Sequence, residues 1–162
     1  MIRIGIGRDI HRLVEGRRFL LAGIELPAEK GELGHSDGDV LAHAVTDALL
    51  GAAALGDIGE FFPPGDPRFK DADSMDLLRR AAESVKRAGW ELINIDCVVI
   101  CEKPAILPHR DRIREALAGA LGLDPEAVFV KGKTAEGLGP AGEGLAVEAE
   151  TVCLLGKKED PY

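Results

Sequence analysis

The segment from Gly34 to His43 gathers two histidines and two aspartates within ten residues. Apolar residues recur after it with helical spacing, so these polar side chains are expected where a loop enters a helix. Asp9 and His11 lie near the N-terminus with i, i+2 spacing, which on a strand points both side chains to one face. With His43 they would form an Asp/His/His set, which is the ligand count of a catalytic zinc with an open position. A lone Asp-X-His is common in proteins without a metal, so the spacing alone leaves ordinary polar packing open.

The second ring nitrogen of His43 would also need a partner. Asp39 and Asp47 lie one turn before and one turn after it, and either could bind this nitrogen on the helix surface. Ser36 or Asp37 is the expected N-cap of the same helix.

A third polar group runs from Lys131 to Glu136, where a strand leaves for a glycine-rich loop. Two lysines, the Thr134 hydroxyl and the Glu136 carboxylate could bind a phosphate and its divalent ion. A solvated strand end is the alternative, and the spacing is not that of a P-loop. In the long loop 56–73, Asp57 beside Gly59 could bind ribose hydroxyls, although the same residues also suit an ordinary loop.

The elements that must position these residues follow from periodicity and turn signals. Strands are expected at 3–11, 18–26, 92–101, 127–134 and 145–155, and helices at 39–55, 74–88 and 109–121. The first two strands would form a hairpin through Glu15 and Gly16, followed by a loop over 27–38. This order predicts a single α/β (α+β) domain over 1–157, with a mixed four- to five-stranded sheet, helices on one face and a charged tail at 158–162. The uncovered face predicts self-association.

Composition narrows the class of protein. The 162 residues carry a net charge of -8, which disfavours nucleic acid and anionic membranes as partners. No secretory signal or membrane-spanning run is present, so the cytoplasm is expected, or a plastid-type organelle if a transit peptide has been removed. The three cysteines, Cys97, Cys101 and Cys153, are expected to be buried thiols; a zinc pair formed by Cys97 and Cys101 is the alternative.

The polar groups also match one known family in order and spacing. The chain resembles the 2-C-methyl-D-erythritol 2,4-cyclodiphosphate synthase family from about Ile2 to Leu155. The matching segments are 7–11 (GRDIH), 35–39 (HSDGD), 43–51 (HAVTDALLG), 55–59 (LGDIG), 108–109 (PH) and 133–139 (KTAEGLG). Each motif is modest, but the ordered set is specific.

The resemblance implies a homotrimer with active sites between subunits. Its reaction is cyclisation of 4-diphosphocytidyl-2-C-methyl-D-erythritol 2-phosphate to the 2,4-cyclodiphosphate, with release of CMP. It implies zinc at Asp9, His11 and His43, and Mg²⁺ or Mn²⁺ at Glu136. His35 and Thr134 match positions that stabilise the transition state. Substrate contacts are implied for Asp9, His11, His35, Ser36, Asp57, Ile58, Gly59, Phe62, Asp66, Cys101, Pro104, Ala105, Ile106, Leu107, Lys133, Thr134 and Glu136.

The chain departs from the family at three places. Ala105 stands where some members have Lys, and Pro64 where some have an acidic residue. Residues 139–144 form a shorter stretch without the aromatic and Arg residues that line the central channel in other members. Two other functional classes use similar ligands: a metal-dependent phosphoester hydrolase, and a non-catalytic trimeric binding module with a structural zinc.

Overall fold

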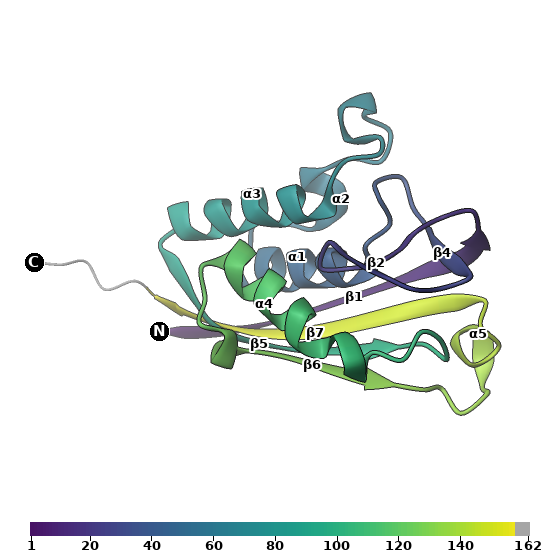
Figure 1. The fold of residues 1–162 in the computed structure, drawn as a ribbon. Helices are drawn as coiled ribbons and strands as arrows, with labels where there is room; N and C mark the ends of the chain where they lie inside the picture. The colour runs from purple at the N-terminus through teal and green to yellow at the C-terminus, as the bar shows by residue number, and fades with distance from the viewer. Residues whose placement is uncertain (158–162) are drawn as a thin grey trace, which may run out of the picture.

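The computed structural model describes residues 1–157, and the tail predicted at 158–162 lies outside the described residues. Its core is a five-stranded sheet with the order β4-β1-β7-β5-β6 (Figure 1). The pair β5–β6 is parallel and the other neighbouring pairs are antiparallel, so the predicted mixed sheet is confirmed. The strands are β1 (Ile2–Glu15), β4 (Lys30–Leu33), β5 (Trp90–Ile100), β6 (Val128–Lys133) and β7 (Ala146–Lys157).

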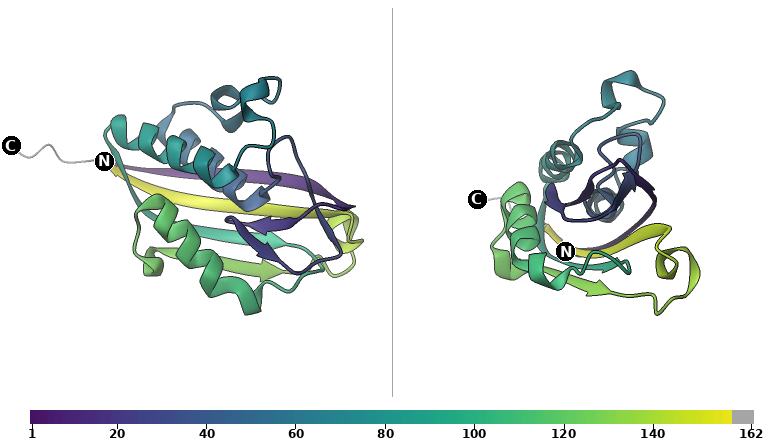
Figure 2. Two further views of the ribbon diagram at one scale, coloured as in Figure 1. Left: turned by 45° about the horizontal axis from the view of Figure 1, so that its top comes forward. Right: turned by 45° about the vertical axis from the view of Figure 1, so that its right-hand side comes forward.

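Three long helices lie on one face of this sheet, as predicted (Figures 1 and 2). They are α1 (Val40–Ala53), α3 (Ser74–Arg87) and α4 (Arg110–Leu121). The short helices are α2 (Ile58–Phe61), α5 (Gly139–Gly142) and the 3-10 turns Pro67–Phe69, Leu107–His109 and Pro125–Ala127. Within residues 1–157, no helix has the length and apolar character needed to cross a membrane.

The opposite face of the sheet is exposed, and on β1 it presents several isoleucines beside Arg8, which is paired with Glu148. Ile4 and Ile6 of β1 are 72% and 65% exposed, and Ile10 is 50% exposed. On the helical face of the same strand, Gly5, Gly7 and Leu13 are buried, as the two-residue period of a strand requires. An apolar surface of this kind is typical of an interface with another protein surface.

Two glycines of β1 allow α1 to pack directly on the strand. A Cβ on Gly5 would lie 2.0 Å from the Ala48 carbonyl oxygen, and one on Gly7 would lie 1.9 Å from that of Ala44. Such distances are far inside van der Waals contact, so only glycine fits this helix–strand separation. The next inward positions of β1 are Asp9 and His11, which therefore meet the first turn of α1.

The region between β1 and α1 differs from the prediction. Residues 18–26 form a separate hairpin, β2 (Phe19–Leu21) and β3 (Ile24–Leu26), instead of one strand. Its turn uses Ala22 and Gly23, both at positive φ, and alanine gives no turn signal of its own. The strand β1 continues to Glu15 and pairs with β4, which lies within the predicted loop 27–38.

Two further local predictions are resolved by the contacts. The N-cap of α1 is Asp39, whose Oδ1 accepts a hydrogen bond from the Ala42 amide at 2.9 Å; Ser36 and Asp37 do not hold that position. All three cysteines are free and buried, which confirms the prediction of buried thiols. Burial raises the pKa of Cys97 to about 12 and that of Cys101 and Cys153 to about 11, so these thiols stay protonated.

Candidate active site

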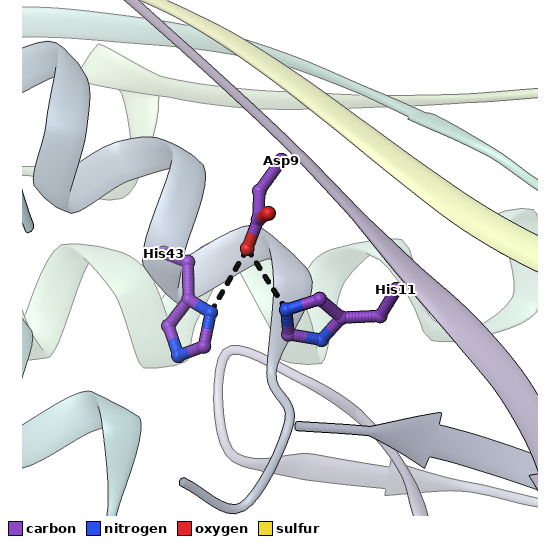
Figure 3. Close-up of side chains that lie close together, drawn as sticks. All are labelled: Asp9, His11 and His43. Carbon is purple, nitrogen blue, oxygen red and sulfur yellow. Dashed lines mark hydrogen bonds and ion pairs between the residues drawn. The ribbon is translucent and has the colours of Figure 1, made fainter. Parts of the chain in front are cut away.

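Asp9, His11 and His43 converge at the point where α1 begins over β1. The Asp9 Oδ2 atom lies 2.9 Å from His43 Nδ1 and 3.0 Å from His11 Nε2 (Figure 3). One donor atom from each of the three residues lies within 4.8 Å of the others. The two imidazole rings are 5.0 Å apart and meet edge to face. The predicted three-ligand set is therefore assembled by one strand and one helix.

The hydrogen bond at the opposite nitrogen of His11 favours a positive charge between His11 and Asp9. His11 Nδ1 donates to the Gly38 carbonyl oxygen at 2.5 Å, since a carbonyl can only accept. In the neutral ring, Nε2 then carries a lone pair and faces the Asp9 carboxylate. Two acceptors at 3.0 Å repel each other unless a proton or a metal ion lies between them.

The electrostatics of the isolated chain fit this reading. Burial favours the neutral form of Asp9, but hydrogen bonds that the His11 and His43 rings donate when they carry a second proton outweigh burial and hold the pKa of Asp9 well below its usual range. Burial also opposes charge on His11, whereas the hydrogen bond and negative charge of Asp9 raise the pKa of His11. Asp9 is thus an anion at neutral pH, and a cation at this point is stabilised. One carboxylate and two imidazoles suit zinc with a position left open, so the residues fit such an ion.

The far nitrogen of His43 has different partners from those predicted. His43 Nε2 lies 2.9 Å from the Ser74 hydroxyl and 3.0 Å from the Ser36 hydroxyl. Asp39 instead caps α1 and accepts from the Gly23 amide at 2.6 Å. Asp47 accepts from the Ile58 amide at 2.8 Å and so anchors the start of α2. Both carboxylates are used by backbone amides, which the sequence spacing does not reveal.

The loop 101–107 and the third polar group meet at the β6 edge of the sheet and form a second cluster. A cavity of about 210 Å³ is lined by Cys101, Glu102, Pro104, Ala105, Ile106, Leu107, Arg110, Gly132, Lys133 and Thr134. Gly132 allows Ile106 to cover the strand, because a Cβ there would lie 2.6 Å from the Ile106 Cβ. The loop 101–107 is therefore fixed against the end of β6.

The loop that follows β6 is held by a carboxylate that the sequence did not single out. Glu102 Oε1 accepts from the Ala135 amide at 3.0 Å and the Gly137 amide at 3.5 Å. Between these residues, Glu136 has φ +54°, a conformation that non-glycine residues adopt mainly at turns and functional sites. The Thr134 hydroxyl donates to Glu136 Oε1 at 2.7 Å, so the two predicted site residues are in direct contact. Lys131 is paired with Asp96 at 2.5 Å, whereas Lys133 has no ion pair among residues 1–157.

The two clusters are separated within one chain. Asp9 pairs with Ala149, Ala149 with Val99, and Val99 with Gly132, so these positions form one row across the sheet. Three strand spacings place the Cα atoms of Asp9 and Gly132 about 14 Å apart. The Asp9 group and the cluster at the end of β6 are therefore two separate groups within residues 1–157.

The remaining predicted residues lie between positions 35 and 66, and only some of them contact the first cluster. Ser36 contacts His43, whereas His35 is exposed on the same loop and its carbonyl accepts from the Asp71 amide at 2.9 Å. Asp57 caps α2 in a capping box with Glu60, and Asp47 fixes the Ile58 amide beside it. Phe62 packs edge to face on Phe61 and Phe69, and Asp66 is paired with Arg68 at 2.6 Å.

One buried residue at the first cluster is not indicated by any sequence pattern. Ser74 is 0% exposed and contacts both His43 and Ser36. In the sequence it follows Asp73 at an ordinary helix start, and nothing there indicates a contact across more than 30 residues.

Known proteins are similar to nearly the whole chain, not only to the segments around the site. The model of the YgbB family matches residues 2–156. A Treponema denticola protein named 2-C-methyl-D-erythritol 2,4-cyclodiphosphate synthase is 53% identical over 154 residues, covering 95% of this chain and 96% of the relative. A Gloeobacter violaceus protein of the same name is 56% identical over 154 residues, covering 95% of this chain and 94% of the relative.

Solved structures are also similar to this chain. A CDP-bound structure of a 2-C-methyl-D-erythritol 2,4-cyclodiphosphate synthase is 41% identical with a TM-score of 0.88, and covers 95% of this chain and all of that one. The bifunctional IspDF of Campylobacter jejuni is 42% identical with a TM-score of 0.95. That match covers 98% of this chain and 43% of the longer bifunctional chain.

Proposed function

Because the chain belongs to the YgbB family, we propose that it is a 2-C-methyl-D-erythritol 2,4-cyclodiphosphate synthase acting in non-mevalonate isoprenoid precursor biosynthesis. Its substrate is 4-diphosphocytidyl-2-C-methyl-D-erythritol 2-phosphate. An oxygen of the 2-phosphate attacks the β-phosphorus of the diphosphate, the bond from that phosphorus to the CMP phosphate oxygen breaks, and CMP leaves. The observation that carries this proposal is the convergence of Asp9, His11 and His43 in a chain of this family.

The main obstacle to this reaction is charge, since nucleophile and electrophile are both anionic. Asp9, His11 and His43 would hold zinc, and Glu136 would hold Mg²⁺ or Mn²⁺; when bound, these ions would supply positive charge to neutralise the phosphates. Holding both phosphate groups of one molecule close together lowers the entropic part of the barrier. No protein nucleophile is required.

The chain supplies donors around the phosphates. Ser36 and His35 precede α1 on the loop beside the metal ligands, and both are assigned to the attacking phosphate and its transition state. Lys133 binds the diphosphate at the β6 edge, and Thr134 binds there as well and stabilises the transition state. The Thr134–Glu136 hydrogen bond supports this assignment, because it keeps both side chains on one side of the loop at 2.7 Å. Lys133 has no competing ion pair among residues 1–157.

The rest of the substrate is assigned to the two loops. The cavity lined by 101–107 and Gly132 binds the cytosine, mainly through backbone groups, and its volume of about 210 Å³ suits a small planar ring. Asp57, Ile58 and Gly59 contact the sugar or erythritol hydroxyls, with Phe62 and Asp66 at the margin of this region. The Asp47–Ile58 hydrogen bond supports this role because it fixes the segment relative to His43 on α1.

We place each complete site between two copies of the chain in a homotrimer. The separation of about 14 Å between the Cα atoms of Asp9 and Gly132 supports this, since a partner copy can bring its β6 edge to the metal cluster. The exposed isoleucines of β1 supply an apolar surface for the assembly. A cytoplasmic location is proposed as well, supported by three free thiols.

Phosphorus NMR of the purified protein with the diphosphocytidyl substrate and Mg²⁺ tests the function. The expected products are a cyclic diphosphate and CMP, lost after zinc chelation and restored by zinc. A linear phosphate that gains one solvent oxygen would show a phosphoester hydrolase instead. Chelation that unfolds or dissociates the protein, without any turnover before it, would favour a binding module with structural zinc.

A further inference from the structure

We propose that Ser74, held by Asp37, is a positioning residue that sets the tautomer of His43 for metal binding. The inference rests on the proposed function, since it assumes that His43 is a metal ligand. It adds two residues that the sequence pattern did not assign to the site, and it replaces Asp39 and Asp47 as the partners of the His43 ring.

Ser74 is buried, and its polar atoms contact Asp37 and His43. Ser74 is the first residue of α3 and is 0% exposed. Its amide donates to Asp37 Oδ2 at 3.1 Å, and its hydroxyl donates to Asp37 Oδ1 at 2.5 Å. The same hydroxyl oxygen lies 2.9 Å from His43 Nε2. Asp37 thus binds both the amide and the hydroxyl of Ser74, and the Ser74 hydroxyl oxygen faces the His43 imidazole.

The loop that carries Asp37 is itself fixed to the segment before α3. The Asp37 amide donates to the Ala72 carbonyl at 3.0 Å, and the Asp71 amide donates to the His35 carbonyl at 2.9 Å. These two backbone bonds keep the loop before α1 and the start of α3 in register. The Ser74 hydroxyl is therefore held in place by backbone as well as side-chain contacts.

A proton count then sets the state of His43. A carboxylate only accepts, so the single hydrogen of the Ser74 hydroxyl is committed to Asp37. Towards His43 the Ser74 oxygen can only accept, which places a hydrogen on Nε2. In the neutral ring Nδ1 is left with a lone pair, and Nδ1 is the atom 2.9 Å from Asp9 Oδ2. His11 is in the corresponding state through Gly38, so both rings direct lone pairs to the same point.

Ser36 is the competing partner of the same nitrogen. Its oxygen lies 3.0 Å from His43 Nε2 and 3.1 Å from the Ser74 oxygen. Because the Ser74 hydrogen is already committed, the hydrogen of Ser36 satisfies the contact between the two hydroxyls. Ser36 can leave this contact for a phosphate, whereas Ser74 stays in place. Outer partners of metal-bound histidines commonly fix the tautomer in this way and raise ligand basicity.

The test compares zinc affinity in Ser74→Ala, Asp37→Asn and Ser84→Ala with that of the natural chain. All are stripped of metal and titrated against a competing chelator. Ser84 lies on the same helix, and its hydroxyl bonds only to α3 neighbours, which makes it the matched control. We expect affinity to fall about 10- to 100-fold in Ser74→Ala, less in Asp37→Asn, and less than about twofold in Ser84→Ala.

Imidazole nitrogen NMR of the zinc-loaded natural protein gives a second readout that needs no variant. The expected signature is a hydrogen on His43 Nε2, with Nδ1 bound to the metal. A hydrogen on Nδ1, or unchanged zinc affinity in a folded Ser74→Ala variant, would overturn the proposal. His43→Ala distinguishes failure of the proposed metal site from failure of the positioning role. If His43→Ala leaves zinc binding intact, the metal centre of the proposed function is wrong. If His43→Ala loses zinc but Ser74→Ala does not change zinc affinity, only the positioning role is refuted.

Discussion

Replacing Gly7 with alanine should damage the metal centre from a position that contacts no ligand. The new Cβ would lie 1.9 Å from the Ala44 carbonyl oxygen and 2.6 Å from the Ala48 amide nitrogen. An ordinary carbon–oxygen contact is about 3.3 Å, so α1 must move away from β1 by about 1.4 Å. Both obstructing atoms belong to the helix backbone, and no side-chain rotation can relieve the contact.

His43 lies on the same turn of α1 as Ala44 and moves with it. A shift of about 1.4 Å would lengthen the 2.9 Å approach of His43 Nδ1 to Asp9 Oδ2 to about 4 Å. Misplacement by about 1 Å typically costs about 100-fold in a positioned site. We expect zinc affinity and turnover to fall by at least that factor, and the free energy of unfolding to fall by about 1–3 kcal/mol.

The matched control is Gly51→Ala on the same helix. A Cβ at Gly51 meets nothing within 4 Å, and its φ is ordinary for a helix. Alanine there should raise stability by about 0.5–1 kcal/mol and leave zinc affinity unchanged. Denaturant unfolding of the metal-free proteins and competitive zinc titration measure both quantities. Natural zinc affinity and an unchanged unfolding midpoint in Gly7→Ala would refute the argument from close packing.

Three other predictions follow from the site and the core. His43→Ala should abolish zinc binding and turnover while circular dichroism shows a retained fold; full zinc occupancy would contradict the ligand assignment. Glu136→Gln should raise the Mg²⁺ concentration needed for half-maximal turnover with zinc retained, and unchanged activity at limiting Mg²⁺ would count against its role. Glu32 is fully buried, and burial together with the charge of Asp39 raises its pKa to about 10 from 4.5. The folded state therefore binds the extra proton between these pH values, and stability falls as pH rises through them. Glu32→Gln cannot lose a proton, so between pH 6 and pH 9 its free energy of unfolding should fall less steeply than that of the natural chain at equal protein concentration. The largest slope that one proton can give is about 1.4 kcal/mol per pH unit. Identical slopes for the two proteins would refute the assignment to Glu32.

Spacing within one element was enough to predict several parts of the site. Asp9 and His11 share a strand face because side chains alternate along any strand, whatever packs on it. The apolar rhythm after Val40 predicted α1, and the alternation of isoleucines with glycines along β1 is consistent with one covered and one open face. The ordered set of motifs predicted the family, which the match over residues 2–156 confirms.

Contacts between elements were decided only by the tertiary structure. The partners of His43 were predicted on its own helix, but Asp39 and Asp47 bind amides of Gly23 and Ile58 from other segments. A carboxylate satisfies whichever donor the fold buries beside it, and local spacing does not specify that donor.

The contact from Ser74 to His43 spans 31 positions in the chain, and Glu102 reaches Ala135 across 33. Each depends on where α3 and the loop after β5 settle on the sheet, which is set by packing of the whole core. The sequence by itself determined which residues could do the chemistry and on which face of their own element they stand. The tertiary structure determined which of them meet, because hydrogen-bond partners are set by distance in space after the core has packed.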